Sequence, residues 1–430
     1  MIGKYILPEM GNVFSEENRF QLMLDVEITA CEAMADIGLI PKEAYLEIKE
    51  KAGYDLARIA EIDAEVRHNT MAFLTCVSER IGESAKYLHM GMSSTDVEDT
   101  ALSLQIIQAI ELVTGKLSQL RVIFSELANE YKYTLMIGRT HGMHAEPITF
   151  GLKMALWVKD IDRSLSRLNH AHNVIMVGKI NGAVGGFATI DPHIETFVCR
   201  RLGLHPAYVT TQSLQRDRHA ECMTALALTG GVIEKMATEI RNLQRTEINE
   251  VEESVSKGQK GSTALPHKRN PAGSEEIAGL SRILRGNAVA ALENIALWHE
   301  RDTTHVPVER IIIPESFFIL DYMLGSFITV MEGINVSPAK MNKNLHSNLG
   351  LIFSQKVLLA LIGKGVMREQ AYDWISRNAS LAWEQQIDFQ YLILEDQDIS
   401  NYLSRREIMD LFDYDAFRKH IDHIFSRADI

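Results

Sequence analysis

The residues with the greatest chemical capability lie between positions 258 and 271, in the segment GQKGSTALPHKRNP. Its two glycines allow unusual backbone angles and its two prolines exclude a helix. Between them stand hydroxyl, cationic and amide side chains: Ser262, Thr263, His267, Lys268, Arg269 and Asn270. We expect a mobile lid that binds a carboxylate or a phosphate, aided by the free amides of a helix starting near Ser274. A solvated linker between two helices is the alternative.

A second polar group lies between positions 138 and 147, in the segment GRTHGMHAEP, where we expect one long helix to end and the next to begin. His141 stands beside glycine, so its imidazole can be approached closely, and imidazole titrates near neutrality, as a general acid or base must. Metal binding by His141 and His144 is the alternative, but no carboxylate or cysteine completes a recognised ligand spacing. We therefore predict no metal site.

Hydroxyl and cationic side chains also gather at residues 67–69, 89–96 and 299–310. The run Ser93 to Asp96 has the composition of a helix N-cap, and such a cap exposes hydroxyls and amides that can hold an anion. The stretch HERDTTHVPVER ends a helix with cations and can serve likewise. Simple capping and a charged helix terminus are the alternatives for these stretches.

The composition excludes several classes of protein. The chain has 430 residues, 46% of them hydrophobic, and can bury a large core. A net charge of -13 without a basic run argues against nucleic acid as a partner. The cysteines lack the spacing of zinc or disulfide sites, so we expect reduced core residues in a cytoplasmic protein. No signal peptide or long unbroken apolar run is visible, which predicts a soluble protein without membrane partners. Nicotinamide-binding, P-loop and zinc-protease motifs are absent from the sequence.

Helices must position these segments, since apolar residues recur at helical spacing along nearly the whole chain. From Ile106 to Leu127 the spacing alternates between four and three, which predicts a long bundle helix over 97–130. Comparable patterns predict long helices over 150–177, 214–253, 275–300 and 310–334. We expect an all-α fold with three helical domains, at 1–95, 96–364 and 365–430. The central domain is predicted to be an elongated bundle of five long helices. Short strands near residues 176–189 remain an alternative.

Four segments together resemble the fumarase/aspartase superfamily: GMSSTDVEDT, GRTHGMHAEP, TQSLQRDRHA and GSTALPHKRNP. Their order and spacing are similar to those of its adenylosuccinate lyase branch, and the resemblance covers nearly the whole chain. Any one segment is moderately specific, whereas four in order, joined by long helices, are very specific.

The resemblance implies a carbon-nitrogen lyase that releases fumarate from adenylosuccinate and from succinylaminoimidazole carboxamide ribotide, in purine nucleotide biosynthesis, without a cofactor. Removing a proton next to a carboxylate creates a doubly charged intermediate, which preorganised donors must neutralise. By similarity, Lys268 and Asn270 have this role. Ser262 is the general base, and His141, paired with Glu275, protonates the departing nitrogen.

The resemblance also implies a set of substrate-binding residues and an assembly. The binding positions are Lys4, Tyr5, Arg67, His68, Asn69, His89, Ser93, Ser94, Thr140, Gln212, Asn270, Arg301 and Arg310. The implied assembly is a homotetramer in which three subunits supply each site and the heptad helices form the central helical core.

This chain departs from the family pattern at several positions. Lys4, Asn69, Ser93 and Thr263 replace the usual arginine, aspartate, threonine and serine, which are mild changes. Val306 and Pro307 replace serines near Arg310, so one phosphate donor is missing. Losing one neutral hydrogen bond costs about 1 kcal/mol, which Arg310 and Lys4 can tolerate. A sister lyase acting on another N-succinyl amine is therefore an alternative, and a non-catalytic helical scaffold is a further one.

Overall fold

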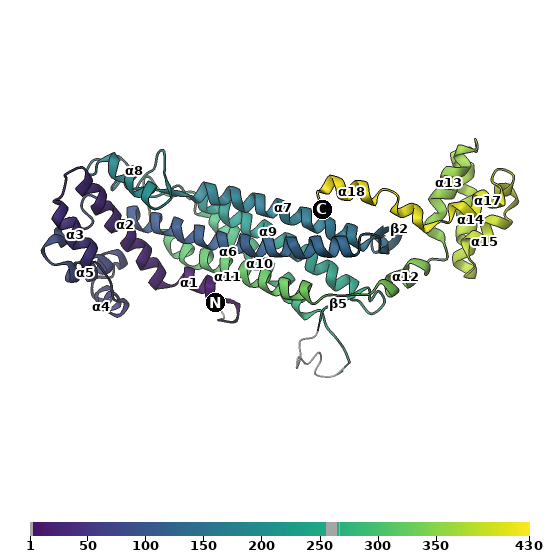
Figure 1. Ribbon diagram of the computed structural model, residues 1–430, viewed down its shortest axis with the longest axis horizontal. Coiled ribbons are helices and arrows are strands. Elements are labelled where there is room, and N and C mark those ends of the chain that lie inside the picture. Colours follow the sequence, from purple (N-terminus) through teal and green to yellow (C-terminus); the bar gives the residue numbers. More distant parts are fainter. Residues whose placement is uncertain (1–2, 255–264, 266) are drawn as a thin grey trace. The chain divides into compact units, whose positions relative to one another are not determined.

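The chain is built almost entirely of helices (Figure 1). The structure is a computed structural model and describes residues 3–254, 265 and 267–430. Within these residues there are eighteen α-helices, four short 3-10 helices and six short strands. The predicted all-α class is confirmed.

The chain divides into two compact units. Unit 1 comprises residues 1–119, 162–237 and 275–329, and unit 2 comprises residues 120–161, 238–274 and 330–430. The predicted boundaries at 95/96 and 364/365 fall inside these units, so the division into three domains stays a prediction.

The N-terminal part of unit 1 consists of helices, most of them short. They are η1 Gly3–Tyr5, α1 Pro8–Val13, α2 Glu16–Asp36, α3 Lys42–Lys51, α4 Leu56–Val66, α5 Asn69–Ile81, η2 Glu83–Tyr87 and, later in the chain, α8 Pro192–Arg201. The side chains of Ser15 and Asp55 begin α2 and α4 by accepting hydrogen bonds from backbone amides three residues ahead. Phe20 and Phe73 stack at the centre of their common core.

Five long helices follow the predicted positions closely. They are α6 Ser94–Glu130, α7 Phe150–Ile175, α9 Asp217–Leu243, α10 Ala272–Glu293 and α11 His305–Glu332. Within unit 1 they are tied side to side by polar contacts: Lys116 with Asp321, His170 with Glu221, Arg285 with Glu234 and Asn287 with Glu315. The predicted heptad positions of α6 from Ile106 to Phe124 are at most 1% exposed, so the heptad face of the helix is used within one chain.

Helix α9 ends ten residues earlier than predicted. The chain turns at Asn249, which has a left-handed backbone, and then forms the short strand β5 Val251–Glu252, paired with β6 Asn335–Val336. The buried Glu250, which lies between Asn249 and β5, accepts two hydrogen bonds from Arg139. These bonds fix the turn.

Helix α11 is long and apolar enough to cross a membrane by length and composition, but 61% of its most apolar window is buried inside the protein. This is what a core helix looks like, and a single such helix is weak evidence for a membrane span.

The segment predicted as a turn between two long helices is a β-hairpin instead. Strands β1 Leu135–Thr140 and β2 Met143–Thr149 are antiparallel, with a bulge between Ile137 and Arg139. The sequence LMIGRTHGMHAEPIT has few of the alternating apolar residues that mark a strand, and its glycines and proline obscured it. The alternative of short strands near 176–189 is borne out by β3 Val177–Gly178, which pairs in parallel with β4 His205–Pro206.

The C-terminal part of unit 2 is a cluster of short helices. They are α12 Pro338–His346, η3 Leu351–Phe353, α13 Ser354–Gly363, α14 Arg368–Gln385, α15 Phe389–Glu395, α16 Gln397–Ser400, α17 Arg405–Leu411, η4 Tyr414–Arg418 and α18 Ile421–Ala428. The hairpin packs its buried Leu135 and Ile137 against Leu345 of α12. The base of the hairpin is therefore anchored while its tip is free to reach outward.

Candidate active site

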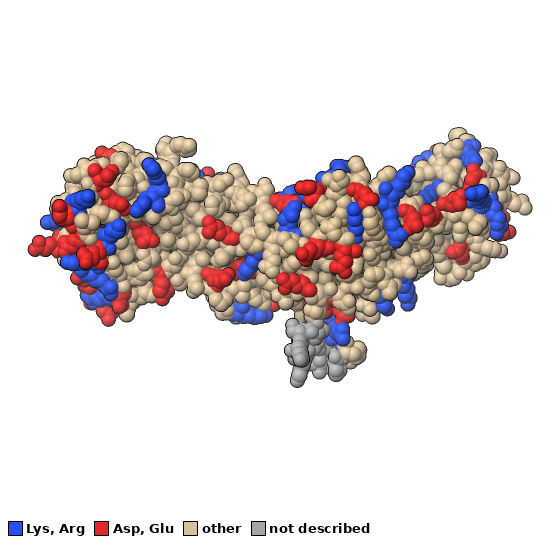
Figure 2. Space-filling model, in the orientation of Figure 1, with Lys and Arg blue, Asp and Glu red and all other residues tan. Residues whose placement is uncertain are grey.

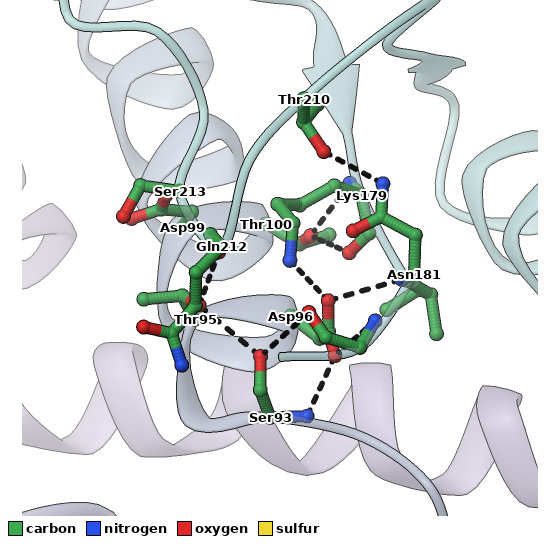
Figure 3. Close-up of polar contacts among 12 residues, drawn as sticks. Ser93, Thr95, Asp96, Asp99, Thr100, Lys179, Asn181, Thr210, Gln212 and Ser213 are labelled. Carbon is green, nitrogen blue, oxygen red and sulfur yellow. Dashed lines mark hydrogen bonds and ion pairs between the residues drawn. The ribbon is translucent and has the colours of Figure 1, made fainter. Parts of the chain in front are cut away.

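The start of α6 presents Ser93 on a support of buried polar groups (Figure 3), and Ser94 is the first residue of the helix. Asp96, at the third helical position, accepts a hydrogen bond from the Ser93 amide at 2.6 Å, which is one half of a capping box. The Thr95 hydroxyl donates to the Gln212 carbonyl at 2.5 Å. The expected N-cap cluster is present, and contacts with buried groups hold its residues in place.

The support depends on a fully buried ion pair between Lys179 and Asp96. The same carboxylate also accepts hydrogen bonds from the amides of Asn181 and Gly182, at 3.1 and 3.2 Å. Asp96 thereby fastens the loop 179–182 to the first turn of α6. A buried charge pair with this many donors is expensive to disrupt, so the geometry is rigid.

Two further predicted residues lie beside this helix start. The Gln212 backbone amide donates to the Glu300 carbonyl at 3.2 Å, and the Arg301 guanidinium donates to the Ser94 hydroxyl at 3.4 Å. Ser93, Ser94, Gln212 and Arg301 are thus brought together, although they are up to 208 positions apart in sequence.

His89 is predicted to bind substrate, and the structure gives it a charged partner. Its Nδ1 lies 2.6 Å from an oxygen of the fully buried Glu27, whose other oxygen accepts from the His89 amide. Burial alone favours the neutral ring, but the Glu27 carboxylate outweighs it and raises the pKa of His89. Glu27 was missed by sequence reasoning, although an acidic residue within the apolar pattern of Leu24, Ile28 and Cys31 was a usable signal.

Arg67, His68 and Asn69 form the junction between α4 and α5. Arg67 has a left-handed backbone, and the His68 ring accepts a hydrogen bond from the Met71 amide at 3.3 Å, so it caps α5. Asn69 Oδ1 accepts a hydrogen bond from Arg19 at 2.6 Å. These contacts give His68 and Asn69 structural roles in addition to the binding roles predicted for them.

Lys4 and Tyr5 both contact Glu276 of α10. Lys4 forms an exposed ion pair with it, and the Tyr5 hydroxyl donates to it at 3.2 Å. The hydrogen bond from Lys4 to Glu276 raises the pKa of this lysine. An exposed pair of this kind is weak and can be exchanged for a ligand.

Arg301 and Arg310 line a cavity of ≈ 180 Å³ in unit 1. Three further lining residues form a buried ionic cluster, in which Arg216 donates two hydrogen bonds of 2.8 Å to Asp99 and two of 2.9 and 3.2 Å to Glu309. Burial raises the pKa of Glu309 to about 7, although Arg216 opposes the shift. Burial would also raise the pKa of Asp99, but the charge of Arg216 outweighs it and holds the pKa below its usual range.

Thr140 and His141 lie at the exposed tip of the hairpin in unit 2. His141 and Gly142 form its two-residue turn, with backbone φ angles of 54° and 77°. Two positive φ values mark the turn type that matches the twist of a hairpin, and histidine is one of the few side chains that tolerates the first position. The turn therefore holds the imidazole out from the strands.

Lys268 and Asn270 lie in the segment before α10, where Lys268 is exposed and Asn270 is partly exposed. Neighbouring Arg269 ties the segment down through an ion pair of 2.8 Å with Glu252. The first amides of α10 were predicted to be free, but the Glu253 carboxylate accepts hydrogen bonds from the amides of Gly273 and Ser274 at 3.1 and 2.8 Å. The helix start therefore carries its own anion, which corrects the expectation of a ligand site there.

Some predictions concern residues that the structure does not describe, or pairs of residues that belong to different units. Ser262 and Thr263 fall outside the described residues. Glu275 is exposed and is the first residue of the third segment of unit 1, while His141 belongs to unit 2, so their pairing stays a prediction. The same division separates Lys268 and Asn270 from the residues around α6.

The site chemistry is that of hydroxyl, imidazole and cationic groups. Across the described part of the chain, no group of three or more His, Cys, Asp or Glu side chains is arranged to hold a metal ion. On the face shown in Figure 2, acidic and basic side chains lie intermixed, in keeping with the net charge of -13. All four cysteines are buried and free.

Comparisons with known proteins point in one direction. Residues 4–286 match the family described as Lyase, and residues 350–428 match the adenylosuccinate lyase C-terminus family. The chain is 50% identical over 427 residues to the adenylosuccinate lyase of Bacillus subtilis (strain 168), covering 99% of both chains. It is 48% identical over 427 residues to that of Streptococcus mutans serotype c (strain ATCC 700610 / UA159), again covering 99% of both.

Solved structures are similar along the whole length. A fumarate lyase from Mesorhizobium sp. BNC1 has a TM-score of 0.90 at 26% identity, covering 99% of this chain and 98% of its own. A 3-carboxy-cis,cis-muconate lactonizing enzyme from Pseudomonas putida has a TM-score of 0.88 at 26% identity, covering 99% and 96%.

Proposed function

This chain belongs to the adenylosuccinate lyases of the fumarase/aspartase superfamily, and from that membership we propose its substrates and the roles of its residues. It is a carbon-nitrogen lyase that releases fumarate, and its principal substrate is adenylosuccinate, which yields AMP. The succinylaminoimidazole carboxamide ribotide is its second proposed substrate. The observation that carries this conclusion is 50% identity over 427 residues. The non-catalytic scaffold is thereby set aside.

The proposed reaction is a β-elimination in which every proton is accounted for. Ser262 removes the proton from the carbon next to a carboxylate, and the electron pair is held briefly as a doubly charged aci-carboxylate. That pair then forms the double bond of fumarate while the carbon-nitrogen bond breaks. His141 donates a proton to the departing nitrogen.

The position of His141 supports its role as the acid. At the exposed tip of a hairpin whose base is buried, the imidazole can reach a substrate without rearrangement of the strands. A left-handed backbone at a non-glycine residue costs free energy that a purely structural turn could avoid with asparagine or glycine. Glu275 is proposed as its partner by resemblance.

The segment before α10 supports the role of Lys268 and Asn270 as stabilisers of the intermediate. Neither side chain is committed to a hydrogen bond with another described residue, so their donors are available. Arg269 and Pro271 between and beside them restrict the backbone. Donors aimed before the charge develops are worth more than donors that must reorganise, and removing one typically costs a factor of about 10²–10³ in kcat.

The remaining predicted residues are proposed to bind the substrate. The hydroxyls of Ser93 and Ser94 and the Arg301 guanidinium already lie together, on a support that keeps them in place. His89, whose charged form Glu27 favours, adds a cation for a carboxylate or phosphate.

The proposed assembly is a homotetramer with sites shared between three subunits. Its support is a pair of exposed apolar residues on one face of α10, Val289 and Leu292, which are 59% and 50% exposed. Exposed apolar residues of this kind are typical of helices that pack against other subunits. The heptad face of α6 is buried within one chain, so neighbouring faces must supply the contacts between subunits. The cytoplasm is the proposed location, since adenylosuccinate is an intracellular nucleotide.

A sister lyase acting on another N-succinyl amine is the second candidate, and one observation favours it. Val306 lines the cavity beside Arg310 where the family pattern has a hydroxyl, and Pro307 in the same turn of α11 has no amide to donate.

A continuous fumarate assay with purified protein separates the two candidates. Adenylosuccinate and a panel of other N-succinyl amines are offered at equal concentration, and fumarate release is followed by absorbance. We expect the highest kcat/KM with adenylosuccinate. A higher value with another amine, or no turnover of adenylosuccinate by tetrameric protein, rejects the proposed substrate.

A further inference from the structure

The cavity lined by Arg301 and Arg310 contains more guanidiniums than carboxylates, so part of its positive charge is not neutralised. Its lining includes four guanidiniums and three carboxylates: Arg19, Arg216, Arg301, Arg310, Glu98, Asp99 and Glu309. Arg216 alone binds two of these carboxylates, Asp99 and Glu309, through hydrogen bonds of 2.8 to 3.2 Å. The other guanidiniums are left with a single carboxylate between them.

That last carboxylate, Glu98, is not paired with any of them. It accepts a hydrogen bond from the Thr70 hydroxyl, and it attracts Arg19 only from beyond ion-pair distance. The Arg19 guanidinium has one hydrogen-bond acceptor among the described residues, the neutral Asn69 Oδ1 at 2.6 Å. Burial lowers the pKa of Arg19, and repulsion from Arg310 lowers it further, against the attraction of Glu98. Arg19 and Arg310 therefore line one cavity and repel each other, and neither forms an ion pair with a carboxylate of the described residues.

Further polar groups at the same cavity are also without partners. His305, which lines the cavity and is fully buried, has no hydrogen bond at either ring nitrogen among the described residues. The buried Nε of Arg301 is likewise unpartnered within this part of the chain. Buried polar groups are normally satisfied, so several unsatisfied donors around one small cavity indicate a ligand with several acceptor oxygens.

We propose that Arg19 is a further specificity-determining residue, whose guanidinium binds the phosphate of the N-succinyl nucleotide together with Arg310. Arg19 is absent from the set predicted from sequence. This inference rests on the proposed function, because it assumes a phosphorylated substrate at this site.

The chemistry favours phosphate over a carboxylate of the succinyl group. A phosphate monoester has three acceptor oxygens and close to two charges, which match two guanidiniums and an additional donor better than a carboxylate does. Val306 lines the same cavity and offers no hydroxyl, and Asn69 leaves the charge of Arg19 unneutralised. In this chain Arg19 takes over the contact that position 306 has lost.

The test compares two substrates on the same protein, adenylosuccinate and its dephosphorylated nucleoside, N-succinyladenosine. For Arg19→Gln we expect KM for adenylosuccinate to rise about 10-fold to 100-fold, the range for one charge-assisted hydrogen-bonding group, with kcat little changed. KM for N-succinyladenosine should change less than about 2-fold. The matched control is Arg58→Gln, which removes an exposed guanidinium that already binds Glu61 and Glu79 and should alter neither KM.

A second pair of variants leaves Arg19 in place and changes its surroundings. Asn69→Asp supplies a carboxylate partner for Arg19, so we expect weaker selection for the phosphorylated substrate. Adding Val306→Ser to Asn69→Asp should restore part of that selection, because the hydroxyl replaces the phosphate contact.

The outcomes separate this inference from the proposed function. If the wild type turns over adenylosuccinate but Arg19→Gln loses the same factor with both substrates, Arg19 does not read the phosphate and the inference is wrong. If Arg19→Gln leaves both KM values unchanged, the inference is also wrong. If the wild type does not act on adenylosuccinate at all, the proposed function itself falls.

Discussion

The start of α6 in unit 1 and the tip of the β1–β2 hairpin in unit 2 both carry predicted site residues, but they are built in opposite ways. Ser93 and Ser94 stand on a buried ion pair and a set of backbone donors gathered by Asp96. His141 stands on a two-residue turn with its side chain exposed. The difference suggests that the residues proposed to bind substrate are held rigidly, whereas the residue proposed to transfer a proton is exposed.

Replacing His141 should have the largest effect on catalysis and the smallest on folding. For His141→Gln we expect kcat to fall about 10²-fold to 10⁴-fold, because a general acid is lost, with the melting temperature unchanged. Fumarate absorbance and thermal unfolding measure the two quantities. His144→Gln, on the same hairpin and also exposed, is the matched control and should retain kcat within about 3-fold. Equal losses for both histidines would show that the hairpin matters only as a whole.

Replacing Asp96 should instead have a larger effect on folding than on catalysis. Asp96→Asn leaves the Lys179 ammonium buried without a counter-charge, so we expect a loss of about 3–5 kcal/mol in the free energy of unfolding. Lys179→Met should cost less, because three backbone amides still bind Asp96. Urea unfolding at neutral pH compares the variants. A fully stable Asp96→Asn protein would contradict the role given to this support.

Two buried histidines of unit 1, His219 and His305, should make this unit sensitive to acid. Burial and the charge of Arg216 lower the pKa of His219 to about 3, against about 6.5 when unfolded. As the pH falls below 6.5 the unfolded chain takes up a proton that the folded chain refuses, so stability is lost. At pH 5 this loss is about 2 kcal/mol for one histidine. His305, with a pKa lowered to about 4, acts in the same direction, and Glu309, with a raised pKa, opposes it.

The variant His219→Leu isolates this contribution. Neither ring nitrogen of His219 has a hydrogen-bond partner among the described residues, so leucine leaves no new group unsatisfied. Urea unfolding at pH 7 and pH 5 should show a smaller loss for the variant, by about 2 kcal/mol. An unchanged dependence in His219→Leu would mean that this ring is protonated in the folded protein.

The hairpin turn should give the smallest effect. Gly142 has a φ of 77°, and an added Cβ would meet no atom within 4 Å, so only backbone strain is at issue. Gly142→Ala should cost about 1 kcal/mol, and Gly142→Asn less, since asparagine tolerates this conformation. Thermal unfolding ranks the two. A larger cost for asparagine than for alanine would contradict the turn assignment.

Much of the helical architecture could be predicted from the sequence because it is encoded locally. The heptad spacing from Ile106 to Leu127 predicted α6 to within three residues at its start, and the apolar patterns located the other long helices. The hairpin could not be found in this way. Its strands are short, and they gain their stability from packing against α12, a contact that no local pattern reveals.

The candidate site was predicted in its residue types but not in its supports. Lys179, Glu27 and Arg19 pair with groups that are 83, 62 and 50 positions away, and such pairings depend on the folded chain. A single charged residue among apolar neighbours, as at Lys179 in MVGKINGAV, is a usable signal of a buried pair. The anion expected at the start of α10 proved to be the protein's own Glu253. Only the fold could show that these donors were already satisfied.

We propose that the Lys268 ammonium, which has no ion-pair partner among the described residues, stabilises the doubly charged intermediate of fumarate release. Single-turnover measurement of fumarate release from adenylosuccinate, comparing wild type with Lys268→Met, tests it most directly. We predict that the variant binds adenylosuccinate and folds normally, but that its rate of fumarate formation falls about 10²-fold to 10³-fold. A rate within about 2-fold of the wild type would show that the Lys268 ammonium does not stabilise the intermediate.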